Sequence, residues 1–143
     1  MKRAPTLAFW MALSILYAQP QARQVQPQAT VHIYRPKLSV GTAAHPTVSC
    51  DMFAIARIQN GRVYTMKVSA GRHSFTTTHD ETGIMVDVES GKEYFVRIDF
   101  TPNARFHGDA SPVLVAPEQG RMETLKLRPL DAQYIEAATC GRP

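Results

Sequence analysis

The feature that most constrains this chain is a series of short apolar runs that alternate with polar residues and are separated by turn residues. Beginning at Met52, the runs MFAIARI, RVYTMKV and RHSFTTT are separated by turns around Gly61 and Gly71. Residues two apart lie on the same face of a β-strand, so this alternation is typical of strands with one buried face. Short strands spaced about ten residues apart, with turns between them, predict an all-β sandwich or barrel.

Further runs extend the pattern along the chain. We expect strands in TVHIY from Thr30, in IMVDVE and EYFVRIDF on either side of Ser90-Gly91, and in PVLVA and METLKLRPL on either side of a turn at Pro117 to Gly120. The tail that begins at Asp131 could form a short helix with Asp131 as its cap. The sequence therefore predicts a single antiparallel β-sandwich, immunoglobulin-like or prealbumin-like, of about seven or eight short strands and a short C-terminal helix.

The segment from Lys37 to Ser49 is a predicted loop or poorly formed edge strand, and the segment from Thr76 to Gly83 is a predicted loop, because small, polar and turn-forming residues dominate them. Apolar side chains of the strands should fill the core. Sequence neighbours in one strand face opposite sides, so the candidate set is an upper limit. It comprises Val31, Ile33, Phe53, Ile55, Val63, Met66, Val68, Phe75, Met85, Val86, Val88, Phe95, Val96, Ile98, Leu114, Leu125 and Leu127.

Three glycines are each followed by a basic residue, in Gly61-Arg62, Gly71-Arg72 and Gly91-Lys92. A glycine-rich anion site places backbone N–H groups at the start of a helix, whereas each of these pairs continues into a predicted strand. We therefore interpret Gly61, Gly71 and Gly91 as structural turns, because glycine adopts positive φ without strain. Asn60-Gly61 also predicts a hairpin with a type I′ turn.

The first residues have the layout of a secretory signal. Lys2 and Arg3 precede an apolar run from Leu7 to Ala18, and roughly 12 apolar residues are too few to span a bilayer core, which takes about 20. We expect residues 1–18 to be a cleaved signal peptide, residues 19–29 a flexible leader rich in Gln and Pro, and residues 30–143 the β-sandwich domain. An uncleaved membrane anchor is the alternative.

Cys50 and Cys140 are the two cysteines of the chain. An even number of cysteines in an oxidising compartment favours pairing, so the sequence predicts one disulfide between them. Two separate thiols are the alternative. Two cysteines are too few for the four-ligand zinc sites that paired CxxC motifs form.

The strand HIYR, the turn SAGRHSF and the strand VESGKEYFVRIDF occur in an order that resembles the DUF2846 family of uncharacterised bacterial exported proteins, which are often lipoproteins. AGRH, in the place of a P-G-x-H turn, is coupled to SGKEYFVR, in the place of a G-K-x-Y-Y-V-R strand. The resemblance extends roughly over residues 30–127. It implies an envelope location and a β-sandwich, and it supplies no activity. No cysteine directly follows the apolar N-terminal run, and Cys50 is too distant, so we do not expect the lipid anchor.

Composition and motifs argue against several functions. Without Lys2 and Arg3, 14 Lys and Arg face 12 Asp and Glu, so the formal charge falls from +4 to about +2. The basic residues are scattered singly among acidic ones, and nucleic acid is therefore not an expected partner. The five histidines form no HxH or HExxH motif, and there is no GxSxG. We expect no bound metal, no cofactor and no catalytic residue.

The leading hypothesis is therefore an exported, non-catalytic β-sandwich of the bacterial envelope, periplasmic or secreted. It would bind a protein or another envelope component through an edge strand or its loops, without stable membrane insertion once the signal is removed. The alternative is a hydrolase or metal-dependent enzyme with a site assembled from loop residues such as His73, His79, Asp80 and His107, because a histidine beside carboxylates can act as a general base.

If the signal is cleaved after Ala18, the exported protein begins at Gln19 and is recovered without detergent. The intact mass of the exported protein measures this directly. A species that still carries Met1, or that is extracted only by detergent, would contradict the prediction.

Overall fold

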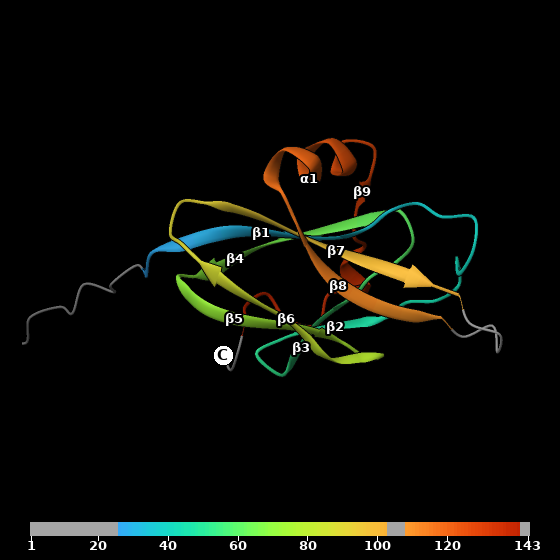
Figure 1. Ribbon diagram of the computed structural model, residues 1–143, viewed down its shortest axis with the longest axis horizontal. Coiled ribbons are helices and arrows are strands. Elements are labelled where there is room, and N and C mark those ends of the chain that lie inside the picture. Colours follow the sequence, from blue (N-terminus) through green and yellow to red (C-terminus); the bar gives the residue numbers. More distant parts are fainter. Residues whose placement is uncertain (1–25, 103–107, 141–143) are drawn as a thin grey trace, which may run out of the picture.

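The computed structural model describes residues 26–102 and 108–140, which form two β-sheets and one short α-helix (Figure 1). Five strands form one sheet in the order β8-β7-β1-β4-β9, and four form the other in the order β3-β2-β5-β6. The helix α1 lies on the outer side of the five-stranded sheet (Figure 1). The predicted all-β sandwich is confirmed. Its elements are β1 (Gln28–Arg35), β2 (Thr47–Cys50), β3 (Phe53–Arg57), β4 (Arg62–Ser69), β5 (Gly71–Thr77), β6 (Asp80–Val88), β7 (Glu93–Thr101), β8 (Asp109–Val115), α1 (Pro117–Thr124), β9 (Arg128–Pro129) and the 3₁₀ helix η1 (Ala132–Tyr134).

The five-stranded sheet is mixed, whereas we predicted antiparallel pairing throughout. Its central strand β1 pairs antiparallel with β4 along its whole length and parallel with β7 from Thr30↔Glu93 to Tyr34↔Arg97. The short strand β9 is also parallel to its neighbour β4. Parallel neighbours cannot be joined by a tight hairpin, so β1 and β7 come from distant parts of the sequence.

The core lies between the sheets and follows the predicted alternation. On β1, Ala29, Val31 and Ile33 are buried among the apolar residues of the other strands. Four members of the predicted core set are instead exposed, because they lie on an outer face, at a sheet edge or on the helix. These are Phe53, Met85, Leu114 and Leu125.

A charged residue ends the inward row of β1. The Arg35 side chain is 0% exposed, and its two terminal nitrogens donate to the backbone carbonyls of Ala44 at 2.6 Å and Gly41 at 2.7 Å. The guanidinium also lies over the Phe100 ring, 4.4 Å from the ring centre. Burial lowers the pKa of Arg35. The carbonyl bonds and the aromatic face stabilise a charge that has left water, although the buried Nε of Arg35 has no hydrogen-bond partner among the described residues. They also tie the segment between β1 and β2 to the core.

The glycine turns connect strands of opposite sheets, so the predicted hairpin at Asn60-Gly61 is wrong. The strands β3 and β4, which flank Gly61, lie in different sheets, as do β4 and β5 around Gly71 and β6 and β7 around Gly91. The three glycines have φ values of 71°, 138° and 78°. Alternation and glycine mark where a strand ends, but they do not determine whether the next strand pairs with it or crosses to the facing sheet.

Two segments that we predicted as loops contain strands. The strand β2 lies at the end of the first and pairs with β3, and the turn between them is Asp51-Met52, where φ is 50° and 72°. The strands β5 and β6 extend through most of the second, with Thr78-His79 between them. Backbone hydrogen bonds hold a strand pair together even where the side chains are polar. Such strands have no alternating apolar pattern, so the sequence did not reveal them.

The predicted turn at Pro117 and the strand METLKLRPL are also wrong, because residues 117–124 form α1. Proline favours the first position of a helix, where its missing N–H costs nothing. Gly120 faces the Phe95 ring so closely that a Cβ atom would lie 2.2 Å from Phe95 Cγ. Asp131 precedes the 3₁₀ helix η1 rather than an α-helix and makes no capping hydrogen bond. None of the helices within residues 26–102 and 108–140 has the length and apolarity that a bilayer crossing requires.

Replacing Gly61 by valine should lower the free energy of unfolding by about 1 kcal/mol or more, because a β-branched residue is strained at positive φ. Urea denaturation of the two proteins measures the difference. Arg72→Gln is the control: the Arg72–Asp87 pair is exposed, so this change should leave the denaturation midpoint unchanged. Equal midpoints for the wild type and Gly61→Val would contradict the prediction.

Candidate functional site

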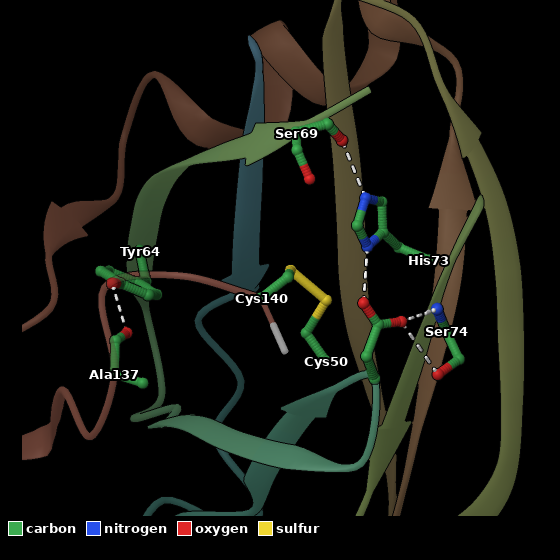
Figure 2. The surroundings of a disulfide bond; sticks show 8 residues. Cys50, Tyr64, Ser69, His73, Ser74, Ala137 and Cys140 are labelled. Atoms are coloured by element: carbon green, nitrogen blue, oxygen red, sulfur yellow. Dashed lines mark hydrogen bonds and ion pairs between the residues drawn. A yellow bond between two sulfur atoms is a disulfide. The ribbon is translucent and has the colours of Figure 1, made fainter. Parts of the chain in front are cut away.

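The C-terminal tail covers the outer edge of β3. Ile135 forms a bridge with Ala56, and the backbone N–H groups of Glu136 and Ala137 both donate to the carbonyl of Ile55, at 2.9 and 3.1 Å. The Tyr64 hydroxyl donates to the carbonyl of Ala137 at 2.9 Å (Figure 2). An uncovered edge presents unpaired N–H and C=O groups to other chains, and here the tail occupies that position.

A disulfide holds this tail in place. The sulfur atoms of Cys50 and Cys140 are 2.10 Å apart, across a sequence separation of 90 residues (Figure 2). The structure thus brings together the two cysteines that we expected to pair. Cross-linking a loop of this length contributes roughly 4 kcal/mol in the chain-entropy account. Cys50 is fully buried and Cys140 is partly exposed.

The residue after Cys50 organises the surrounding strands. Asp51 occupies the turn between β2 and β3 with positive φ, a conformation that aspartate tolerates better than most residues. One carboxylate oxygen accepts a hydrogen bond from the backbone N–H of Ser74 at 2.9 Å. The other lies 2.7 Å from Nδ1 of His73. A single carboxylate therefore joins the β2–β3 turn to β5.

His73 lies beside the disulfide, with a hydrogen-bond acceptor at each ring nitrogen. Nδ1 faces the Asp51 carboxylate, and Nε2 lies 2.8 Å from the carbonyl oxygen of Ser69 (Figure 2). A neutral imidazole carries one N–H and an imidazolium carries two. Both hydrogen bonds can form together only with a proton on each ring nitrogen. The His73–Asp51 pair lies next to the buried sulfur of Cys50.

A groove of about 440 Å³ opens at another side of the sandwich, where the end of β6 lies near the end of β8. Leu114 lies opposite Val96 in the register of β8 and β7, so its side chain faces the core side of the sheet. It is nevertheless 48% exposed, because β6 ends at Val88 and leaves it uncovered. Tyr94 and Leu114 line the groove together, with Asp87 and Glu89 among its acidic lining residues.

The strand β6 itself is acidic and has a free edge. Among the described residues it pairs with β5 on one side and has no partner strand on the other. It carries Asp80, Glu81 and Asp87 and no Lys or Arg, and Glu89 follows it directly. Lysine is a common protection of an exposed edge, and β6 lacks it.

Comparison with known families identifies the chain. Residues 25–110 match the model of a family described as a protein of unknown function, DUF2846. The chain belongs to the DUF2846 family. The match includes β1 to β7 and ends in β8, before α1 and Cys140. No curated protein and no solved structure matches the chain.

The two sequence segments that carried the DUF2846 resemblance lie side by side. HIYR belongs to β1 and SGKEYFVR runs into β7, and these strands form the parallel pair at the centre of the five-stranded sheet. On its outer face, His32 stacks on Phe95, with ring centres 4.6 Å apart. Its ring nitrogens lie 2.8 Å from Thr65 Oγ1 and 2.7 Å from Glu93 Oε1. Hydrogen bonds from His32 and Arg121 hold the pKa of Glu93 below its usual range.

Glu123 of α1 contacts the same outer face of the five-stranded sheet. Its carboxylate accepts hydrogen bonds from the Tyr34 hydroxyl and from Arg97, whose guanidinium also pairs with Asp99 at 2.6 Å. Burial and the Glu123 carboxylate raise the pKa of the Tyr34 hydroxyl. Burial alone would raise the pKa of Glu123, but the hydrogen bonds from Tyr34 and Gln119 and the Arg97 charge lower it overall. This network fastens α1 to the sheet.

The loop residues of the alternative enzyme hypothesis do not form one cluster in the described structure. His73 bonds to Asp51 and Ser69, whereas the Asp80 carboxylate accepts the backbone N–H of Gly83 at 3.0 Å. His79 instead lines a cleft that also contains His45, and His107 lies outside the described residues. Sequence reasoning missed Asp51. A turn-forming aspartate between two strands could have indicated this role. We did not recognise it because we had not predicted β2, the strand that precedes Asp51, as a regular strand.

Replacing Glu123 by glutamine should destabilise the protein at neutral pH and less so in acid. The folded-state pKa of Glu123 is lowered, so the stability that its charge contributes is present above about pH 4.5 and is lost as the pH falls below that value. The urea midpoints of the wild type and Glu123→Gln should converge as the pH falls.

The matched control is Glu118→Gln, which removes an exposed carboxylate from the first turn of the same helix. It should show a smaller effect, with weak dependence on pH. A constant difference between the wild type and Glu123→Gln from neutral to acid pH would contradict the prediction.

Proposed function

We propose that this DUF2846 protein is an exported, non-catalytic β-sandwich of the bacterial envelope that binds an extended segment of a partner protein along β6. The partner segment would add to the free edge of β6, place an apolar side chain over Leu114 in the groove, and present Lys or Arg to the acidic side chains beside it. Extended segments bind other sheet edges in this way, with backbone hydrogen bonds for affinity and alternate side chains for specificity.

The exposure of Leu114 is the observation that carries the proposal. A leucine on the core side of a sheet is normally covered, and burying such a side chain contributes roughly 1.5–3 kcal/mol. Leu114 stays 48% exposed above a groove of the size that receives a side chain. Tyr94, whose hydroxyl accepts the backbone N–H of Glu89 at 2.8 Å, provides a second apolar surface beside it.

Charge and edge geometry favour a basic, extended occupant. Asp80, Glu81 and Asp87 lie on β6, and Glu89 follows it directly. Arg72 pairs with Asp87 and Lys92 pairs with Glu89, in both cases at exposed positions. Such exposed pairs contribute little, so a basic partner can replace them. The other edge of the same sheet, β3, is already occupied by the tail.

Two other observations support the proposed export of the protein. The N-terminal sequence has the layout of a signal peptide, and the disulfide between Cys50 and Cys140 is of a kind that persists in oxidising compartments. Both support export, and an exported sheet edge meets the extended segments of other envelope proteins.

Binding of a short synthetic peptide of alternating lysine and valine, followed by fluorescence anisotropy, tests the proposal. We expect saturable binding by the mature protein, slower hydrogen exchange in the amides of β6, and much weaker binding of a peptide of alternating glutamate and valine. Leu114→Asp should weaken binding at least about tenfold, which corresponds to 1.4 kcal/mol.

Leu125→Asp is the matched control, since Leu125 is 82% exposed at the end of α1 and the charge change is identical. It should bind the lysine–valine peptide like the wild type. Equal weakening by the two substitutions, or protection of amides elsewhere than in β6, would sink the proposal.

A further inference from the structure

The geometry around His73 points to a second activity: we propose that the Cys50–Cys140 disulfide exchanges with an external thiol. The thiol becomes joined to Cys140, Cys50 leaves as a thiolate beside His73, and the tail is freed from β3. This inference is independent of the groove at β6. It uses residues of the inner strands β2 and β5 of the four-stranded sheet and of the β2–β3 turn, where the disulfide, the His73–Asp51 pair and the tail meet.

The two sulfur atoms differ in access. Cys50 is 0% exposed, whereas Cys140 lies partly exposed near the end of the described tail. A thiolate must reach one sulfur from outside and push the other away. The burial therefore directs attack to Cys140 Sγ and makes Cys50 Sγ the leaving group.

The leaving sulfur has a histidine beside it. A His73 nitrogen and the two cysteine sulfurs all lie within 4.8 Å of one another. Both ring nitrogens of His73 face hydrogen-bond acceptors, the Asp51 carboxylate and the Ser69 carbonyl, an arrangement that an imidazolium with two N–H groups satisfies. A neighbouring imidazolium stabilises a cysteine thiolate, and a stabilised thiolate is the faster leaving group.

The exchange step balances without any oxidant or reductant beyond the thiol. The incoming thiolate, R–S⁻, forms an S–S bond with Cys140 as the Cys50–Cys140 bond breaks, and the electron pair of that bond stays on Cys50. The products are an R–S–S–Cys140 mixed disulfide and a Cys50 thiolate in contact range of His73. A second thiolate of the same class can then attack the outer sulfur of the mixed disulfide, which gives R–S–S–R and releases Cys140 as a thiolate.

Exchange at the disulfide would change whether the tail covers the backbone groups at the edge of β3. Without the covalent link, the described tail is held by the two N–H bonds to Ile55, the bridge to Ala56 and the Tyr64 hydroxyl bond. Tyr134 and Ala137 also pack against the core and Glu136 pairs with Arg57, whereas Ile135 is 36% exposed. After exchange, only these noncovalent contacts keep the tail docked. Its release uncovers the Ile55 carbonyl and the edge of β3, a surface that accepts another extended strand.

Incubation of the folded wild-type protein with excess reduced glutathione, followed by alkylation and peptide mapping, tests the proposal. We expect glutathione on Cys140, the alkylating reagent on Cys50, and faster hydrogen exchange at Ala56 and residues 135–140. Glutathione attached to Cys50, or exchange that begins only in denaturant, would overturn the proposal. These measurements need no variant and so do not depend on how a substitution affects folding.

His73→Gln should slow the exchange at least about tenfold, because the leaving thiolate loses its cation. His79→Gln is the matched control: His79 is an exposed residue after β5, and its loss should leave the rate unchanged. Equal rates for the wild type and a folded His73→Gln would show that the bridge has no assistance from His73 and would overturn the proposal.

Discussion

The unpaired edges of the two sheets determine much of how this molecule is built. The five-stranded sheet ends at β9, a two-residue strand added to β4, and at β8, whose Pro112 has no N–H to offer. In the four-stranded sheet, the tail covers β3 through hydrogen bonds to Ile55. Within the described residues, β6 hydrogen-bonds to β5 on one side and has no paired strand on the other, although it also packs near β8. The proposed binding site follows from this elimination, since an extended partner needs an edge that the chain has not already used.

The covered edge depends in turn on Asp51. Its carboxylate bonds to Ser74 and to His73, and its backbone makes the tight turn that presents Cys50 to the tail. Polar groups that leave water need hydrogen-bond partners. Here the Ser69 carbonyl and the Ser74 N–H supply them for the His73 ring and the Asp51 carboxylate. The same contacts that hold the turn also place the His73 ring near the disulfide, so the structural role and the proposed thiol chemistry share one set of atoms.

The sequence predicted the class of fold because period-two alternation reports which face of a strand is buried. It located Val31, Ile33 and Ile98 in the core for this reason. It could not determine pairing, because Gly61, Gly71 and Gly91 give the same local signal in a hairpin and in a crossing between sheets. It also placed Leu114 and Leu125 in the core, although one faces a groove and the other ends a helix. Exposure of an apolar residue depends on what lies opposite it, and that is a property of the whole fold.

The end of the family match divides the molecule by role. The matched residues, 25–110, include the inner strands of both sheets, the Asp51–His73 pair and all of β6. The later residues supply Leu114 in the groove, α1 on the outer face and Cys140 in the bridge. The residues of this chain that match the DUF2846 model therefore include the acidic strand β6 and the His73–Asp51 pair. Leu114 beside that strand and Cys140 beside that pair lie after the matched residues, so the proposed binding and the proposed exchange each depend on both parts of the chain.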